Sequence, residues 1–151
     1  MPSEPSPLDA HVGFWLRFVS NCVSHAFRQK VEALGVTVAE WVVLRQLLAS
    51  GATAPSGVAE ALGMTRGAIS KLVARLLSKK LVTRTAGQDD KRFQTVALTP
   101  AGRKLIPRLS ALADANDAEF FGHLGDEQRM QLMELMKDIV RRHALKNVPV
   151  E

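Results

Sequence analysis

The sequence has a single cysteine, Cys22, and no tyrosine among its 151 residues. One cysteine excludes an internal disulfide framework, so we expect a protein of a reducing compartment. No stretch approaches the roughly 18 apolar residues that a membrane-spanning helix needs. The first ten residues, MPSEPSPLDA, lack the basic and apolar regions of a secretion signal. We therefore expect a cytoplasmic protein with no membrane partner.

Sequence motifs for catalysis are also absent. The chain has no Gly-rich phosphate loop, no Gly-x-Ser-x-Gly elbow and no His-Glu-x-x-His motif. Its four histidines are scattered, at positions 11, 25, 123 and 143. These absences predict a protein that is not an enzyme, with no cofactor and no metal site.

The composition fits one compact domain, because 46% of the residues are apolar and 23% are charged. The net charge of +5 is concentrated in one segment. Between Met64 and Arg92 the chain has eight basic and two acidic residues, a net charge of +6, so the remainder carries −1. Such a concentration is typical of a surface that faces a polyanion. The alternative is a basic surface that contacts only solvent.

The N-terminal third predicts two helices. Residues 1–7 contain three prolines and two serines and predict a loose tail. Apolar residues at helical spacing predict a helix from Leu8 to Leu34, which Gly35 ends. Thr37 and Glu40 match a capping box and open a second helix. The residues of this second helix expected to point inward are Trp41, Leu44, Leu47 and Leu48.

The next segment predicts a helix-turn-helix motif. Pro55 suits the first turn of a short helix, Gly63 ends it, and Thr65 caps a following helix that reaches Lys80. A three-residue turn containing glycine joins the two helices. The stripe of the second helix expected to be buried is Ile69, Leu72, Val73, Leu76 and Leu77. The residues on its opposite face are Arg66, Ser70, Lys71 and Arg75.

A hairpin and two further helices complete the chain. Alternating polarity predicts strands at Leu81–Arg84 and Phe93–Leu98. Thr99 and Pro100 then open a helix in which Pro107 predicts a kink near Arg103. The apolar stripe of that helix is Leu105, Leu109, Leu112, Ala113, Phe120 and Phe121. The stripe of the last helix is Leu132, Met133, Met136, Ile139 and Val140.

This order of elements resembles the MarR family of bacterial winged-helix transcriptional regulators, from Leu8 to Leu145. Three segments carry the resemblance: LVTR at 81–84, DDKR at 89–92 and VALTPAGRKL at 96–105. They match a strand that ends in arginine, an Asp-x-Arg wing tip, and a strand that runs into Leu-Thr-x-x-Gly.

The resemblance implies a mainly α fold with a small β-wing, in a single domain over residues 8–151. Residues 37–99 would form the winged helix-turn-helix lobe. The flanking segments, 8–34 and 100–147, would be mainly dimerisation helices, since each has a wider apolar face than one small lobe can bury. The implied protein is a homodimeric repressor that binds double-stranded DNA at a near-palindromic promoter site.

The candidate DNA-binding residues lie on the second helix of the motif and on the hairpin. The N-terminal part of a recognition helix reaches base edges in the major groove, which favours Arg66, Ser70 and Lys71 there. Phosphate contacts suit Thr65 and Arg75. In the family, the arginine of the wing enters the minor groove and the aspartate holds it. By this resemblance, Arg92 would enter the minor groove and Asp90 would hold it in place. Lys91 would bind a phosphate, and Arg84 is the arginine that ends the first strand. The alternative is a set of exposed polar residues without a partner.

Many members of the family respond to small aromatic acids bound between the dimer helices and the DNA-binding lobe. A pocket of aromatic residues with a cation suits an amphipathic anion. The candidate ligand-binding residues are His11, Phe14, Trp15, Phe18, Trp41 and Arg45. The alternative is that these aromatic residues belong to the core.

Cys22 offers a further route of regulation. Some relatives sense peroxides through a cysteine near the start of the first helix with tyrosine partners, but this chain has no tyrosine. A reactive thiol needs a group that lowers its pKa, and His25 is the nearest candidate. We expect Cys22 to be a buried, structural cysteine. The alternatives are that Cys22 makes the protein a thiol-responsive or a metal-responsive regulator. Another alternative to DNA binding is a winged-helix module that binds only protein.

Overall fold

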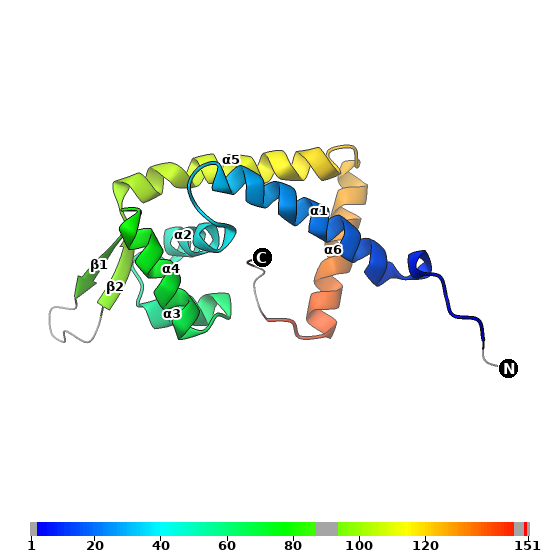
Figure 1. Ribbon diagram of the computed structural model, residues 1–151, viewed down its shortest axis with the longest axis horizontal. Helices are drawn as coiled ribbons and strands as arrows, with labels where there is room; N and C mark the ends of the chain where they lie inside the picture. Colours follow the sequence, from blue (N-terminus) through cyan, green and yellow to red (C-terminus); the bar gives the residue numbers. More distant parts are fainter. Residues whose placement is uncertain (1–2, 87–93, 147–149, 151) are drawn as a thin grey trace.

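The computed structural model describes residues 3–86, 94–146 and 150. The chain is mostly helical with one two-stranded antiparallel sheet (Figure 1), so the predicted fold class is confirmed. Residues 3–7 have no regular secondary structure and are exposed. The elements, in chain order, are a 3-10 turn η1 (Leu8–Ala10), α1 (Val12–Glu32), α2 (Val38–Ser50), α3 (Pro55–Leu62), α4 (Arg66–Ser78), β1 (Val82–Ala86), β2 (Gln94–Leu98), α5 (Pro100–Phe121) and α6 (Asp126–Arg142).

Side-chain caps begin three of the helices, as predicted. Thr37 Oγ1 accepts the Glu40 amide hydrogen at 3.1 Å, and the Glu40 carboxylate accepts the Thr37 amide hydrogen at 3.3 Å. These two bonds form the capping box at the start of α2. Thr65 and Thr99 cap α4 and α5, each accepting from the amide three positions ahead, at 3.1 and 3.0 Å. The short-range chemistry of the sequence therefore fixes where these helices start.

Glycines with positive φ follow the first and third helices. Gly35 has φ of 84° and Gly63 has φ of 65°, a conformation that costs glycine little. The start of the first helix differs from the prediction. Leu8 lies in the 3-10 turn and α1 begins only at Val12, so the chain changes direction before the long helix starts.

The hydrophobic core lies in the lobe formed by α2, α3, α4 and the hairpin, where the C-terminal end of α1 and the first half of α5 pack against it. The apolar faces of these helices meet there, because each helix presents apolar residues at i, i+3 and i+4 spacing. The buried apolar residues are Val31, Val36, Val43, Leu44, Leu47, Val58, Ala59, Leu62, Ile69, Leu72, Val73, Leu76, Leu81, Val82, Val96, Leu98, Ile106 and Leu109.

Three predicted core positions differ. Leu48 was expected to point inward but is 40% exposed, because the buried face of α2 is centred on Val43, Leu44 and Leu47 and Leu48 lies at its edge. Trp41, expected to point inward, and Leu77, expected in the buried stripe of α4, are half-buried and pack against the core. Apolar periodicity identified the core face of each helix but not its width.

The hairpin is tied to the helix-turn-helix motif. Its strands pair from Val82 opposite Leu98 to Ala86 opposite Gln94, so β1 begins one residue later and ends two residues later than predicted. The loop between α2 and α3 adds a bridge, in which Thr53 and Val96 exchange two backbone hydrogen bonds of 3.0 and 2.9 Å. The base of the wing is thereby fixed to the lobe.

The start of α5 is joined to the segment that leaves α4. The Thr99 amide donates to the Leu81 carbonyl at 3.1 Å, and the Thr99 hydroxyl donates to the Lys80 carbonyl at 2.8 Å. A Cβ atom on Gly102 would lie 2.1 Å from the Leu81 carbonyl oxygen. This close approach explains the glycine in the Leu-Thr-x-x-Gly segment.

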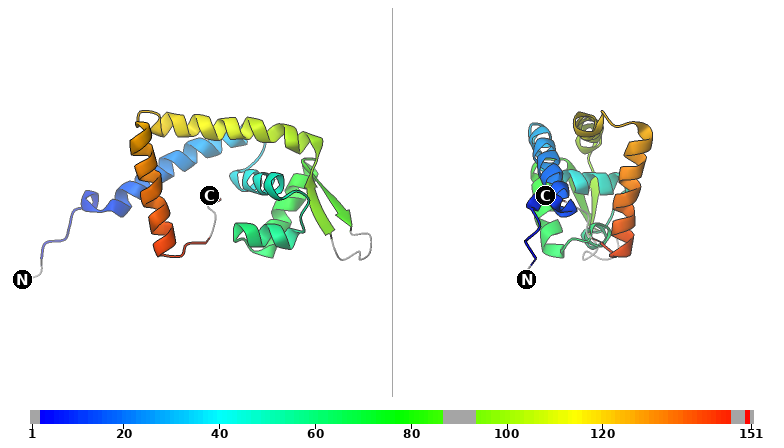
Figure 2. Two further views of the ribbon diagram at one scale, coloured as in Figure 1. Left: turned by 180° about the vertical axis from the view of Figure 1, so that it is seen from behind. Right: turned by 90° about the vertical axis from the view of Figure 1, so that its right-hand side faces the viewer.

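Two long helices extend away from the lobe. α1 and α5 pack against each other, and α6 lies at the end of α5 far from the lobe (Figures 1 and 2). A polar cluster joins α1 to α5: Lys30 Nζ donates to Asn116 Oδ1 at 3.0 Å and to Glu119 at 2.6 Å, and buried Asn116 donates to the Val23 carbonyl at 3.2 Å. α5 is helical through Pro107.

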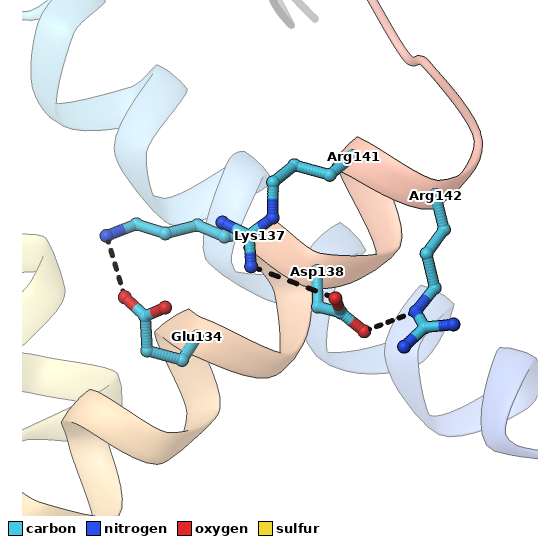
Figure 3. A network of polar contacts seen from close by, with 5 residues as sticks. All are labelled: Glu134, Lys137, Asp138, Arg141 and Arg142. Carbon is cyan, nitrogen blue, oxygen red and sulfur yellow. Dashed lines mark hydrogen bonds and ion pairs between the residues drawn. The ribbon is translucent and has the colours of Figure 1, made fainter.

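The terminal helices expose much of their apolar surface. On α1 the exposed residues include Val12, Trp15, Leu16 and Val19, between 43% and 82% exposed. α6 buries none of its residues in the single chain. Its charged residues pair along one side, where Glu134 meets Lys137, and Asp138 meets Arg141 and Arg142 (Figure 3). Its apolar stripe, Leu132, Met133, Met136, Ile139 and Val140, is 37% to 49% exposed.

No helix in the part of the chain that the structure describes is long and apolar enough to cross a membrane.

Candidate nucleic-acid interface

α4 has two faces of opposite character. Four of its residues, Ile69, Leu72, Val73 and Leu76, are at most 7% exposed and fix the helix on the core. The predicted DNA-binding residues on the other face, Arg66, Ser70, Lys71 and Arg75, are all exposed. The core therefore positions one helix so that three cations and a hydroxyl face away from the protein.

Thr65 holds the start of this helix. Its hydroxyl oxygen accepts from the Ala68 amide, which leaves the hydroxyl hydrogen free to donate to a further acceptor. The preceding turn, Gly63–Thr65, sets α4 against α3. The helix-turn-helix geometry predicted from the sequence is present in the structure.

The wing lies beside α4 (Figure 1). Arg84 is exposed in the middle of β1, where it pairs with Val96 of β2. The predicted wing-tip residues Asp90, Lys91 and Arg92 lie outside the described residues, so their roles stay predictions. β1 ends at Ala86 and β2 begins at Gln94.

An ion pair between a partly exposed lysine and a buried glutamate fixes the C-terminal end of α4. Lys79, at the C-cap, donates to Glu40 Oε2 at 2.6 Å, and the Glu40 side chain is completely buried. Glu40 thus serves both the capping box of α2 and the end of α4. Its other oxygen, Oε1, is buried without a hydrogen-bond partner among the described residues. The sequence identified the capping box but gave no signal for Lys79, which lies 39 positions away.

A cleft of about 730 Å³ lies between α1, α2 and α4. Of the six predicted ligand-binding residues only Trp41 lines it, while Arg45 lies over the Trp41 ring with its guanidinium carbon 5.8 Å from the ring centroid. Sequence reasoning missed Phe27 and Arg28 of α1 as lining residues, although Phe27 lies on the predicted apolar stripe. The lining residues are Ser24, Phe27, Arg28, Glu32, Thr37, Val38, Ala39, Trp41, Val42, Arg75 and Val150.

The other predicted ligand-binding residues form a separate group at the start of α1. The Phe14 ring lies 5.2 Å from that of Trp15 and 6.2 Å from that of Phe18, measured between centroids. The His11 imidazole lies 3.1 Å from the Pro7 carbonyl, and the Trp15 indole donates to the Asp9 carbonyl at 2.8 Å. Within one chain, this group does not line the cleft at Trp41.

Cys22 is exposed, and the expectation of a buried cysteine is wrong for the single chain. The reason is its position on α1, where the neighbouring residues Asn21 and His25 are also exposed and no other element covers them. No group of three or more His, Cys, Asp or Glu residues suited to a metal ion occurs within residues 3–86, 94–146 and 150.

Comparisons with known proteins agree with this arrangement. The sequence model of the MarR family matches residues 34–92. The transcriptional regulator HosA of Escherichia coli O111:H- is 27% identical over 116 residues, which cover 77% of this chain and 86% of HosA. Two solved structures superpose with a TM-score of 0.76 at 26% identity. One is BpsR of Bordetella bronchiseptica, whose DNA binding is regulated by 6-hydroxynicotinic acid. The match covers 90% of this chain and 97% of the BpsR chain. The other is CouR of Rhodococcus jostii RHA1 bound to p-coumaroyl-CoA. The match covers 96% of this chain and 99% of the CouR chain.

Proposed function

Because the chain belongs to the MarR family of winged-helix transcriptional regulators, we propose that it is a homodimeric repressor of a near-palindromic promoter site. The observation that carries this proposal is the exposed face of α4. Arg66, Lys71 and Arg75 project from a helix whose opposite face is fully packed. A rigid helix with a cationic outer face fits the major groove of B-DNA. The regulators that the chain resembles act by binding, and we propose no catalytic step.

Within the major groove, the first turns of α4 reach base edges. Arg66 and Lys71 can donate to guanine, whereas Ser70 can serve several bases and specifies weakly. Thr65 and Arg75 are assigned to phosphates, which position the helix without reading sequence. Arg84 on β1 adds a phosphate contact beside them.

The wing supplies the minor-groove contact. Arg92 enters the groove, Asp90 holds the guanidinium, and Lys91 binds phosphate. The narrow minor groove of A·T-rich DNA attracts arginine by its negative potential. The exposed hairpin that extends from the lobe supports this assignment.

The dimer forms through the terminal helices. The apolar surface of α1 and α6 that one chain leaves exposed supports burial against a second copy. A two-fold dimer presents two copies of α4 to one side of the duplex, so its half-sites lie about 10 bp apart, centre to centre.

An aromatic anion that binds in the cleft at Trp41 relieves repression. Phe27 and Trp41 supply aromatic surface, while Arg28 and Arg75 supply positive charge. The regulator of BpsR, 6-hydroxynicotinic acid, is an aromatic acid, and p-coumaroyl-CoA, to which CouR is bound, is the CoA thioester of an aromatic acid. The cleft lies between α1 of the dimer arm and α4 of the lobe. A ligand there changes the spacing of the two recognition helices.

Salt dependence of binding tests the proposal against a module that binds only protein. The affinity of the purified protein for duplex DNA is measured by fluorescence anisotropy between 50 and 200 mM salt, a range over which a protein with 6–10 phosphate contacts loses about 10³- to 10⁵-fold. We expect a loss of this order. An affinity that barely changes with salt contradicts a phosphate-binding surface and favours the protein-binding module.

A further inference from the structure

A second cleft, of about 370 Å³, lies at the base of the wing. It is formed where three segments meet: the turn between α1 and α2, the end of α4 with the start of β1, and the first turns of α5. The cleft adjoins the end of the hairpin at which β1 begins and β2 ends, since its lining residue Leu81 directly precedes β1. No lining residue is shared with the cleft at Trp41.

The lining residues of this cleft combine aliphatic surface with positive charge. Four are aliphatic side chains that are buried or half-buried, namely Leu34, Val36, Leu81 and Leu105. Three are cations, namely Lys79, Lys104 and Arg108. The lining includes no acidic residue and no aromatic residue. The cleft at Trp41 has both, so the two sites differ in the ligands that they suit.

The cations are placed to share one anion. Lys104 and Arg108 lie four positions apart on α5, so their side chains leave the same face of the helix. Neither forms an ion pair with another residue in the described ranges. Their charge is therefore not neutralised by a neighbour within those ranges.

Lys79 already binds one carboxylate. Its ammonium group donates to Glu40 at 2.6 Å, yet its side chain is 36% exposed. An ammonium group has three hydrogens to donate, and Glu40 accepts one of them. The others can bind a ligand on the open side of the cleft.

We propose that this cleft binds a small amphipathic anion, a carboxylate on a short aliphatic chain. The carboxylate pairs with Lys104 and Arg108 and receives a further bond from Lys79. The chain lies on Leu34, Leu81 and Leu105, where burial of apolar surface adds to the affinity. A volume of this size is at the lower end of the range for small-molecule sites, which suits a medium-chain acid. This proposal is independent of whether the protein represses or binds DNA.

Such a ligand contacts the C-cap of the recognition helix and the first turns of α5 at the same time. These two segments are already joined by Thr99, which bonds to Lys80 and Leu81. A bound anion therefore adds a bridge between the DNA-binding lobe and the helix that leads to the dimer arm.

The test is a titration of the isotope-labelled full chain with octanoate, followed by backbone amide shifts. We expect saturable shifts at Gly35, Leu81 and Ala101, which line the cleft. Acetate has the charge without the chain, and 1-octanol has the chain without the charge. Both should bind at least tenfold more weakly than octanoate.

Three single variants locate the binding site. Lys104→Ala and Arg108→Ala should each weaken octanoate binding about three- to fivefold, the effect of one partly exposed ion pair. Arg103→Ala is the matched control, since Arg103 is an exposed cation on α5 that does not line the cleft. Equal weakening in all three variants overturns the proposal, as does acetate binding as tightly as octanoate. Shifts confined to Phe27 and Trp41 also overturn it, because they place the ligand in the other cleft.

Discussion

The pairing of Glu40 with Lys79 should hold the C-terminal end of α4 in place, and Lys79→Met tests this. The substitution keeps the length and apolar stem of the side chain but removes its charge. The Glu40 carboxylate, which is fully buried and already has one unpartnered oxygen, then loses its only ion-pair partner among the described residues. Breaking a buried pair costs about 3–5 kcal/mol. Since Lys79 is 36% exposed, we expect the lower end, about 3 kcal/mol.

A loss of about 3 kcal/mol is a large part of the 5–15 kcal/mol that stabilises a typical domain. For a chain of this length it lowers the melting temperature by about 6–12 °C. The assay is urea unfolding followed by circular dichroism, at one protein concentration because a dimer's stability depends on concentration. Lys80→Met is the matched control, since Lys80 is the adjacent cation and is exposed.

The double variant Glu40→Gln with Lys79→Met separates the charge from the packing. Glutamine can still complete the capping box with Thr37, so the double variant removes the uncompensated charge and keeps the helix cap. It should recover part of the stability that Lys79→Met loses. The reasoning is refuted if Lys79→Met costs no more than Lys80→Met, or if the double variant is less stable than Lys79→Met alone.

Four further variants test the interface and the fold. Arg92→Ala should weaken specific DNA binding about tenfold or more, with little change in melting temperature. Asp90→Ala should lose part of the same affinity. If the Asp90→Ala variant binds DNA as tightly as the wild type, Asp90 does not hold Arg92 in the minor groove. Lys71→Ala should relax base preference at one position of each half-site by about 1–3 kcal/mol. Competition between operator variants measures this preference. An equal loss of affinity on all sequences would make Lys71 a phosphate contact. Gly102→Ala should destabilise the fold by about 1–3 kcal/mol, because the added Cβ atom would lie 2.1 Å from the Leu81 carbonyl oxygen. Urea unfolding measures this loss. An unchanged unfolding midpoint contradicts the close approach of Gly102 to Leu81.

Features that depend on neighbouring residues were predictable from the sequence. Thr37, Thr65 and Thr99 cap helices because a hydroxyl reaches an amide only three positions ahead. Gly35 and Gly63 end helices because glycine adopts positive φ at little cost. These signals placed the helix-turn-helix motif and the hairpin in the correct order.

Features that depend on distant residues were not predictable. The pairing of Glu40 with Lys79 joins two helices, and no local pattern indicates it. The exposure of Cys22 and Leu48 depends on which neighbouring elements cover α1 and α2. The cleft at Trp41 likewise requires residues of α1, α2 and α4 to come together, so its lining by Arg28 had no signal in the sequence.

We propose that a two-fold dimer reads DNA through paired copies of α4. Selection of bound sequences from a pool of random duplexes tests this proposal. We expect a near-palindrome whose half-sites lie about 10 bp apart, centre to centre. Recovery of sequences without two-fold symmetry, or of no preferred sequence, would contradict both the dimer and the regulatory function.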